Sequence, residues 1–392
     1  MANRKLKDWV GGLLELVEDT EAPRAFWMWG ALYTIGATLR RQVWLPFGIQ
    51  NIYPNLYVLL VAPPAKARKG GPPKLAKQML NALHIPVAVD STSKRALTKE
   101  LEEVSGTQYF TYKGKQQTQA SLAIISSEMS SLLAIDPKGI IEFLTDVYDS
   151  HDEWKYKTSS QGSDMLYNLC VGAFIATTPT WLMGNLPLEA IGGGFTSRFA
   201  IITGYEKYKR ISIPGILDQK LYNALIHDLN LMCAIVGPFE WEEGALYRYD
   251  NWYNGFDAKI AATKDTRMHG YIERMHVIML KVAMILRASY SDKPILVERD
   301  IGRAIELVEA VLDTASDSLG GKGESKFGAI SDIIMLQIKQ YKKIQFSELL
   351  AINHRDANKT ELEEIVLTLT SMKVITEITK EDGTRWLRWN AK

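Results

Sequence analysis

The sequence predicts an α/β protein with a largely parallel central sheet, and two observations carry this prediction. Five short apolar runs occur between residues 56 and 203, and they are continuous rather than alternating, which is typical of strands covered on both faces. Helical segments separate most of these runs, and strands that alternate with helices pair in parallel. The predicted strands comprise residues 56–61, 86–89, 122–125, 171–176 and 199–203.

Length and composition set limits on the class of protein. At roughly 150 residues per domain, 392 residues suggest two or three domains. A hydrophobic content of 46% and a charged content of 23% exclude disordered and fibrous proteins. Lys and Arg number 46 and Asp and Glu 45, a net charge of +1, so any contact with nucleic acid must come from local basic patches.

Cysteine, histidine and hydropathy patterns exclude further classes. Cys170 and Cys233 have apolar neighbours and are predicted to be small buried residues in a reducing compartment. The six histidines are scattered without metal-ligand spacing, so we expect no metal site built from protein ligands. No segment approaches the roughly 18 apolar residues of a membrane helix, so we expect a soluble, cytoplasmic protein without a membrane partner.

Residues 1–50 are predicted to form a helical N-terminal region. Helical periodicity covers residues 5–45 in two segments that break at Asp19 and Thr20, with Thr20 as a cap and Pro23 in the first turn of the second helix. The second segment is apolar over too wide a surface to have a free face. We therefore expect it to be buried against the domain that follows.

Residues 51–212 are predicted to form the α/β core. After the first strand, a loop rich in Pro, Lys and Gly leads into a helix over residues 74–83. The serines and threonine of residues 91–93 cap a helix that ends near Val104. A polar hairpin then turns at residues 113–115, and a helix over residues 137–148 lies between the third and fourth strands.

The rest of the chain is predicted to be a helical lid, residues 213–318, and a winged-helix domain, residues 329–392. The lid helices cover residues 215–235, 243–262, 268–289 and 298–316, and residues 316–328 form a glycine-rich linker. Three helices over residues 330–340, 346–350 and 359–372 precede a hairpin over residues 374–389 that turns at Asp382 and Gly383. Helices followed by such a hairpin are the order of a winged helix.

The loop after the first strand occupies the position of a phosphate-binding loop. Such a loop needs converging N–H groups, a lysine and the N-terminus of a helix. If Lys69 is that lysine, the two motif glycines fall on Pro63 and Arg68, and the magnesium-binding hydroxyl falls on Gly70. The loop is either a degenerate nucleotide site or an exposed basic turn.

Three further strand boundaries carry candidate residues. Glu128 follows the third strand, where phosphate-loop ATPases place an acid that polarises water, although a helix start is the alternative. Thr178 closes the fourth strand and suits contact with a γ-phosphate, or caps the helix at Pro179. Arg198 follows the glycines 192–194 directly before the last strand, and suits either a phosphate from a neighbouring subunit or a structural salt bridge.

These residues carry a resemblance over about three quarters of the chain. The carrying segments are Ala22-Pro23 with Phe26 and Trp29, and residues 54–58, 63–70, 125–128 and 192–198. The stretch from Thr20 to about Ala315 resembles the phage and prophage replication ATPases related to primase-helicases, in the broad AAA+ and superfamily 3 group of P-loop proteins. The resemblance implies an ATP-driven DNA helicase or translocase that assembles as a ring and uses ATP and Mg²⁺.

The resemblance also implies roles for individual residues. By position, Glu128 is the catalytic carboxylate, Thr178 the sensor at the γ-phosphate, and Arg198 the arginine finger that acts in trans. The implied nucleotide-binding residues are Pro64, Ala65, Arg68, Lys69, Gly70, Gly71 and Ser127, with Arg274 as a second sensor. Because the loop glycines and the loop Ser or Thr are missing and Ser127 replaces an acid, hydrolysis is left open.

DNA contact is expected at two places. The predicted winged helix has Lys359 on its recognition helix, and Arg385 and Arg388 beside Trp386 and Trp389 on the wing, which pairs charge with stacking surface. Glu361, Glu363 and Glu364 on the same helix favour protein contacts instead. The hairpin with Lys113 and Lys115 suits the central channel of a ring, or is a solvated turn.

Three functions follow from these patterns. The first is a ring-forming, homo-hexameric ATPase of phage-type DNA replication, encoded by a phage or mobile element, acting in the bacterial cytoplasm with a primase or polymerase as a further partner. The second is a non-catalytic or weakly catalytic DNA-binding ring, such as a helicase loader or an origin-binding protein. The third is a dimeric transcription regulator with a ligand domain.

Overall fold

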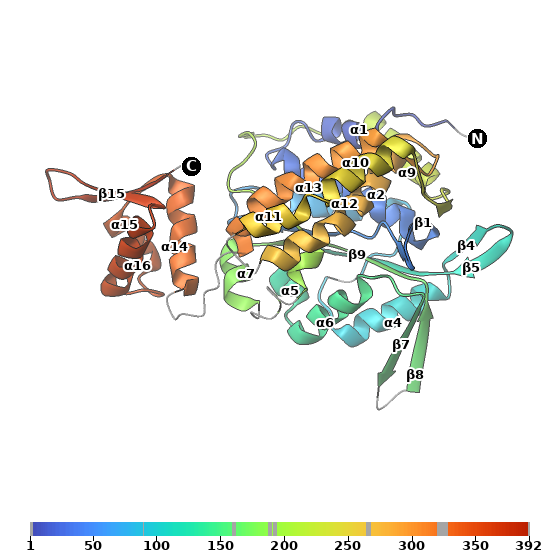
Figure 1. Ribbon diagram of the computed structural model, residues 1–392, viewed down its shortest axis with the longest axis horizontal. Coiled ribbons are helices and arrows are strands. Elements are labelled where there is room, and N and C mark those ends of the chain that lie inside the picture. Colours follow the sequence, from blue (N-terminus) through green and yellow to red (C-terminus); the bar gives the residue numbers. More distant parts are fainter. Residues whose placement is uncertain are drawn as a thin grey trace. The chain divides into compact units, whose positions relative to one another are not determined.

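The computed structural model describes residues 3–88, 90–158, 162–186, 190, 194–263, 268–319 and 328–390, as shown in Figure 1. The chain divides into two compact units. The larger unit consists of Met1–Thr178 and Pro187–Ala315, and the smaller unit consists of Pro179–Leu186 and Ser316–Lys392. Each is a mixed assembly of helices and strands.

A four-stranded parallel sheet forms the centre of the larger unit and confirms the predicted α/β class. Its strands run in the order β10 (Ala200–Thr203), β3 (Tyr57–Val61), β9 (Leu169–Thr177) and β6 (Ala120–Ser126). Every neighbouring pair is parallel. All residues of β3, β6 and β9 are buried, which explains why their sequences are continuously apolar.

The second predicted strand, residues 86–89, is much shorter in the structure than the sequence suggests. Only Val87 takes part in a parallel bridge, with Ala123 of β6, and Val89 lies outside the described residues. Pro86 has no N–H to donate to the sheet. This bridge extends the sheet beyond β6. Numbered by their order along the chain, the five predicted strands therefore lie side by side in the order fifth, first, fourth, third and second.

Helices surround this sheet. Most residues of α2 (Arg24–Leu39) are buried, and the helix packs against β3 and β9 as predicted for the apolar N-terminal segment. The Ser93 side chain accepts a hydrogen bond from the Ala96 N–H and caps α4, as predicted. The other helices of the larger unit are α1 (Trp9–Leu16), α3 (Gly71–Ala82), α4 (Lys94–Ser105), α5 (Met129–Leu132), α6 (Pro137–Val147), α9 (Gln219–Met232), α10 (Glu243–Tyr253), α11 (Phe256–Ala262), α12 (His269–Tyr290) and α13 (Glu298–Leu319).

Several predicted boundaries were wrong. The second N-terminal helix does not continue to residue 45: Arg40 adopts a positive φ of 53°, and a single turn, η1 (Arg40–Gln42), leads into β1 (Val43–Phe47). That strand pairs with β2 (Gln50–Ile52) and β11 (Gly237–Pro238). Thr20 does not cap α2, because its hydroxyl donates to the Val17 carbonyl. The helix predicted over residues 243–262 is interrupted at Asn254 and Gly255.

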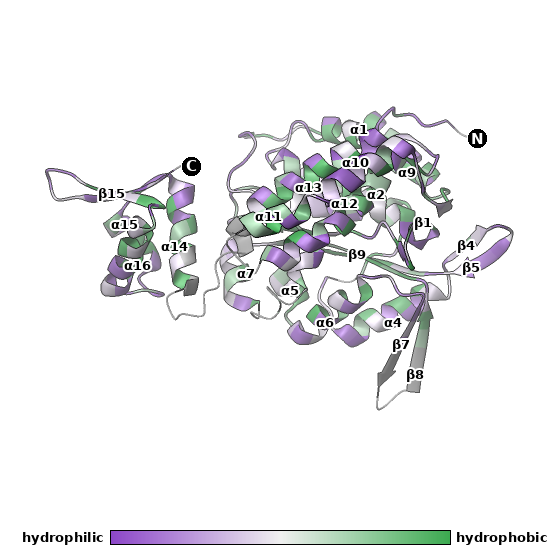
Figure 2. Cartoon of the chain, viewed as in Figure 1, coloured by the Kyte–Doolittle hydropathy of each residue, from purple (hydrophilic) through white to green (hydrophobic). Residues whose placement is uncertain are grey.

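Two hairpins extend from the larger unit (Figure 1). The predicted hairpin consists of β4 (Tyr109–Tyr112) and β5 (Lys115–Thr118), and its β5 strand is strongly hydrophilic in Figure 2. The other, β7 (Glu153–Thr158) with β8 (Gly162–Tyr167), was missed by the sequence reading. Short strands β12 (Glu240–Trp241) and β13 (Ile295–Leu296) pair separately.

A buried polar cluster fixes the amino end of β3 to α12. The Lys281 ammonium donates to the backbone carbonyl of Asn55 at 2.9 Å and to its side-chain oxygen at 2.8 Å. The Asn55 side-chain amide donates to the carbonyls of Tyr148 and Val171. Lys281 is 3% exposed, and burial lowers the pKa of its ammonium to about 7. Asn55 therefore ties β9, the segment after α6, and α12 together at one point.

The smaller unit holds the C-terminal elements in the predicted order of three helices and a hairpin. They are α14 (Gly328–Tyr341), β14 (Lys343–Gln345), α15 (Phe346–Asn353), α16 (Lys359–Ser371), β15 (Ile375–Thr379) and β16 (Arg385–Trp389), with α7 (Pro179–Asn185) from earlier in the chain. The sheet is antiparallel in the order β14-β16-β15. Buried residues of the helices pack on Ile344 and Leu387 of this sheet.

The Lys281 cluster predicts a pH dependence of stability that a variant can isolate. The unfolded chain keeps a lysine proton up to about pH 10, whereas the folded chain releases it near pH 7. The free energy of unfolding should therefore rise between pH 7 and about pH 8.5, by at most about 1.4 kcal/mol per pH unit, and this rise should be absent in Lys281→Met. Urea unfolding at pH 6, 7 and 8.5 measures it.

The rise in the free energy of unfolding is expected only up to about pH 8.5, where the thiol of Cys170, a neighbour of Lys281, also affects stability. Burial raises the pKa of this thiol to about 11 in the folded chain. A folded state that retains the thiol proton loses stability at higher pH. Lys99→Met, on the exposed surface of α4, is the matched control and should follow the wild-type profile. If Lys281→Met and wild type rise in parallel, Lys281 is not the group that titrates.

Candidate functional site

The carboxyl edge of the parallel sheet contains the point at which the chain changes direction. The chain leaves β3 toward the β6 side of the sheet and leaves β9 toward β10, on the opposite side. The two strands end together, because Val61 is paired with Thr177 and the Ala62 N–H donates to the Thr177 carbonyl at 3.1 Å. Open α/β sheets bind ligands at such a point, where consecutive connections diverge.

Lys69 and Glu128 meet at this edge. The Lys69 ammonium lies 3.0 Å from a carboxylate oxygen of Glu128. Lys69 is 8% exposed, whereas the Glu128 side chain is about half exposed. The Ser126 hydroxyl, at the end of β6, donates to the Glu128 carbonyl at 2.9 Å and holds the turn that carries this carboxylate. Two residues predicted from separate strand ends are thus in direct contact.

The remaining predicted residues of this edge are close by in the fold. Gly70 faces Ser127, whose hydroxyl would lie 4.0 Å from a Cβ atom built on Gly70. Thr178 directly follows β9, whose last residue is paired with the end of β3. The edge therefore holds one buried cation, one half-exposed carboxylate and several hydroxyl groups. This set suits a phosphate and a water molecule.

The start of α3 departs from a phosphate-binding loop. The helix begins at Gly71, three residues earlier than predicted, and the Gly71 N–H donates to the Arg68 carbonyl. Pro72 and Pro73 have no N–H, and the Lys74 N–H donates to the Gly70 carbonyl. The first turn of α3 consequently has no free N–H for an anion, so phosphate binding by a helix N-terminus is not possible here in this conformation.

The loop before α3 is tightly coiled. The Lys66 N–H donates to the Pro63 carbonyl and closes a turn around Pro64 and Ala65, and Ala65 has a φ of 57°. Arg68 also has a positive φ, of 50°. Its guanidinium does not point to an open anion site, because its Nε donates to Glu21 at 2.7 Å.

Glu21 is a residue that the sequence reading missed. Its carboxylate accepts hydrogen bonds from Lys207 at 2.5 Å, from Arg68, and from the Ile211 N–H at 3.3 Å. The hydrogen bonds from Lys207 and Arg68 lower the pKa of Glu21 to about 2. Glu21 therefore joins the loop before α3 to the segment after β10. Its position next to the Ala22-Pro23 segment of the resemblance was the signal available in the sequence.

Arg198 lies at the opposite, amino edge of the sheet. It ends the turn η2 (Thr196–Arg198), which immediately precedes β10. One guanidinium nitrogen donates to the Gly194 carbonyl at 2.5 Å and another lies 3.4 Å from a carboxylate oxygen of Asp149. Arg198 is 8% exposed. A strand of five residues, about 16 Å, separates this edge from Lys69, so Arg198 cannot reach a phosphate at Lys69 of its own chain.

Arg274 belongs to the same amino edge. Burial lowers the pKa of its guanidinium, and the like charge of Arg198 lowers it further, while Asp149 acts in the opposite direction. Arg274 is therefore a neighbour of Arg198 and Asp149. The sequence reading missed Asp149, although its place after the predicted helix 137–148 put it near the start of β9. Gly192 and Gly193, which belong to the Arg198 motif, lie outside the described residues.

The predicted DNA-contacting residues differ in their exposure and in the contacts that they already make within the chain. Lys113 and Lys115 are exposed at the tip of the β4–β5 hairpin, where Lys113 and Gly114 form a tight turn with positive φ angles. Lys359 is exposed at the start of α16, and Arg388 is exposed on β16. Arg385 is already engaged, because its guanidinium bonds to Glu377 at 2.5 Å and to Glu363 at 3.3 Å.

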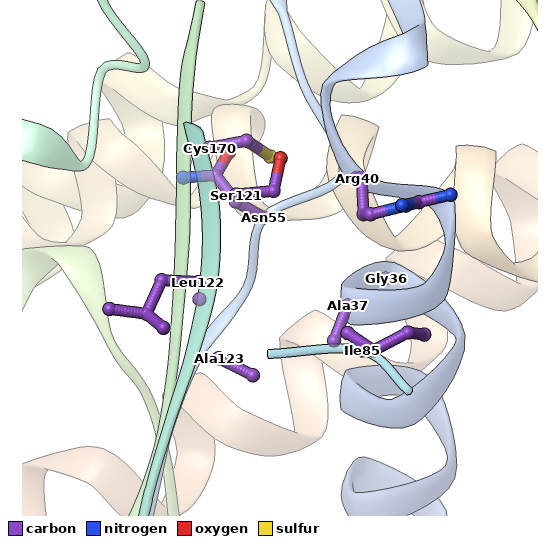
Figure 3. Close-up of a pocket in the computed structure, with 10 residues that line it drawn as sticks. Gly36, Ala37, Arg40, Asn55, Ile85, Ser121, Leu122, Ala123 and Cys170 are labelled. Carbon is purple, nitrogen blue, oxygen red and sulfur yellow. The ribbon is translucent and has the colours of Figure 1, made fainter. Parts of the chain in front are cut away.

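A small cavity lies elsewhere, beside α2 and the amino ends of β6 and β9 (Figure 3). Its volume of about 10 Å³ has room for one water molecule. Gly36 and Ala37 of α2, Asn55, and Cys170 of β9 line it. It is too small for a substrate, so the candidate site remains the carboxyl edge at Lys69 and Glu128.

No family model matches this chain, and no curated protein matches it. In the described part of the chain, no helix has the length and apolar character needed to span a membrane. The same residues include no group of three or more His, Cys, Asp or Glu side chains that could hold a metal ion. The side-chain oxygens at the carboxyl edge that could face a cation are those of Glu128, Ser127 and Thr178. The residues fit a bound phosphate at Lys69 better than one held by the backbone of α3.

The buried position of Arg198 predicts a structural cost for its removal. Arg198→Ala deprives the Gly194 carbonyl and Asp149 of a donor, so the free energy of unfolding should fall by about 2–3 kcal/mol. Urea unfolding of the nucleotide-free protein measures this. Arg210→Ala, at an exposed arginine, should change it by less than about 0.5 kcal/mol. Equal stabilities for both variants would contradict a structurally held guanidinium.

Proposed function

We propose that this chain is a nucleotide-dependent motor of the replication-ATPase type, which binds ATP at the carboxyl edge of its sheet and translocates on or unwinds DNA as a ring. The observation that carries the proposal is the contact of Lys69 with Glu128, 3.0 Å apart, where the connections of β3 and β9 diverge. The resemblance described above supports the same edge, since it assigns the phosphate-binding lysine and the catalytic carboxylate to these two residues.

The proposed mechanism begins with an exchange of partners at Lys69. Lys69 leaves Glu128 and binds the terminal phosphates, a more highly charged partner than one carboxylate. Glu128, no longer paired, orients the attacking water and accepts its proton. The water oxygen bonds to the γ-phosphorus, the bond between that phosphorus and the β–γ bridging oxygen breaks, and ADP leaves. Thr178 donates its hydroxyl toward the γ-phosphate. Mg²⁺, when bound, would neutralise phosphate charge, and Ser127 and Glu128 would be its protein ligands.

Ring assembly gives Arg198 its role in this proposal. Because Arg198 is at the amino edge, it serves the nucleotide of a neighbouring subunit rather than its own. To do so it must release the Gly194 carbonyl and Asp149, with Arg274 beside it. A homo-hexamer with a primase or polymerase as a further partner, encoded by a phage or mobile element and acting in the bacterial cytoplasm, completes the proposal.

DNA contact is assigned to two exposed elements. The element order α14–β14–α15–α16–β15–β16 supports a winged-helix fold for the smaller unit. The β4–β5 hairpin, with Lys113 and Lys115 at its tip, is proposed to line the channel of the ring. These local cations meet the phosphate backbone although the net charge of the chain is only +1.

A second candidate function is a non-catalytic or weakly catalytic DNA-binding ring, such as a loader or an origin-binding protein. The observation that favours it is the first turn of α3, in which Pro72 and Pro73 have no N–H and the other two N–H groups are bonded. Without that backbone cradle, ATP binding depends mainly on Lys69. Robust Mg²⁺-dependent turnover would exclude this candidate.

The motor proposal predicts different effects for Lys69 and Glu128. Lys69→Ala should weaken ATP binding by at least tenfold, because it removes the buried cation of the edge. Glu128→Gln should bind ATP at least as tightly as wild type, because Lys69 loses a competing partner, and should lower DNA-stimulated hydrolysis by 100-fold or more. Titration of a fluorescent ATP analogue and a steady-state phosphate-release assay measure the two effects.

Lys77→Ala is the matched control, because Lys77 lies on α3, which follows the loop that carries Lys69, and it pairs with Asp90 rather than with Glu128. It should bind and hydrolyse ATP as wild type does. Native mass spectrometry with ATP and single-stranded DNA should show a hexamer. The proposal fails if Lys69→Ala and Lys77→Ala bind ATP equally well, or if wild type does not bind ATP.

A further inference from the structure

One face of the small sheet in the C-terminal unit, here called the outer face, is opposite to the face on which the helices of that unit pack. Residues directly opposite one another on antiparallel strands point to the same face. Ile344 is opposite Leu387, and both are buried against the helices, so the alternate residues point outward. The outward residues of the three strands are Lys343, Gln345, Thr376, Ile378, Trp386 and Arg388.

The outer face combines an indole ring with three cations. Lys343 is directly opposite Arg388, and both side chains are exposed. The Lys343 ammonium lies 4.8 Å from the centre of the Trp386 ring, and the Lys380 ammonium lies 5.0 Å from it. Trp386 is half-buried beneath these lysines. A flat aromatic surface bordered by positive charge suits a strand of bases linked by phosphates.

Two acids of the smaller unit, Glu377 and Glu363, lie on the other side of the sheet, whereas Asp382 of the β15–β16 turn is near Lys380. Glu377 and Glu363 both bond to Arg385, which lies two residues before the buried Leu387 and therefore on its side of the sheet. Among the outward strand residues there is no Asp or Glu. The outer face is therefore complementary in charge to a phosphate backbone.

The helix α16 is less suited to nucleic acid than the outer face. Besides Lys359 it carries Glu361, Glu363 and Glu364. Glu361 closes a capping box with Asn358, which fixes its carboxylate at the start of the helix. If α16 entered a groove of duplex DNA, these acids would face phosphates. A flat sheet inserts no element into a groove, and it favours a single strand whose bases can stack on an aromatic ring.

We propose that the outer face binds single-stranded nucleic acid, with Lys343, Lys380 and Arg388 contacting phosphates and the Trp386 ring stacking on a base. This rests on the DNA-binding part of the proposed function. It transfers the main contact from the recognition helix to the sheet.

The test is fluorescence anisotropy of the full chain with a labelled oligothymidylate of about 20 nucleotides, without nucleotide triphosphate; one small β domain covers roughly 4–16 nucleotides. The double variant Lys343→Gln with Arg388→Gln should bind about tenfold more weakly. Its slope of log affinity against log salt should be smaller by about 1.4, because two phosphate contacts are lost. Trp386→Leu should also bind about tenfold more weakly, while Trp386→Phe should retain most of the affinity.

Lys359→Gln tests whether α16 makes the contact instead, and contact through the outer face predicts wild-type binding for this variant. All variants are checked by thermal unfolding, and the exposed Lys343 and Arg388 make the double variant interpretable even where a Trp386 variant is unstable. The inference is overturned if Lys359→Gln weakens binding as much as the double variant does. It is also overturned if wild type prefers a duplex of equal length and Trp386→Phe and Trp386→Leu bind alike.

The same experiment separates this inference from the motor. Lys69→Ala is titrated with the oligonucleotide and with the ATP analogue. A wild-type chain that binds ATP but no oligonucleotide overturns the outer-face inference alone. A chain that binds the oligonucleotide through Lys343 and Arg388, but no ATP, supports the outer face and overturns the motor.

Discussion

The burial of β3 between two parallel neighbours is the constraint on which the structure depends. The chain leaves the central strand β3 at the carboxyl edge of the sheet. The neighbouring strands β9 and β10 end at that same edge. The loop that leaves β3 carries Lys69, and the turn that leaves β6 carries Glu128. Their contact at 3.0 Å thus follows from the strand order, although the two residues are far apart in the sequence.

The two edges of the sheet have different electrostatic character. At the carboxyl edge a single buried lysine has a half-exposed carboxylate as its partner, which an incoming anion can replace. At the amino edge burial lowers the pKa of both Arg274 and Lys281, the charge of Arg198 contributes to this lowering, and Asp149 acts on both in the opposite direction. Burial of several cations with one acid is costly in a low-dielectric interior. In the ring proposed above, the nucleotide of a neighbouring subunit would add negative charge at this edge.

The sequence predicted the elements that are set by local signals and missed those set by tertiary contacts. Continuous apolar runs located β3, β6, β9 and β10, and Ser93 located a helix start. By contrast, Arg40 ends α2 with a backbone conformation that no sequence pattern signals, and Val87 forms only a bridge because Pro86 precedes it. Glu21 and Asp149 were missed because their partners, Arg68 and Arg198, come from distant segments. The hydrogen bonds of the first turn of α3 likewise depend on how the loop before it folds, because the Gly71 N–H donates to the Arg68 carbonyl of that loop.

The most direct test of the central claim is a structure of the chain with a non-hydrolysable ATP analogue. The proposed mechanism predicts that the terminal phosphate lies within hydrogen-bond distance of the Lys69 ammonium, with Lys69 separated from Glu128 and the Glu128 carboxylate facing the γ-phosphate. A complex in which the Lys69–Glu128 contact remains intact, with the analogue bound elsewhere on the chain, would contradict it.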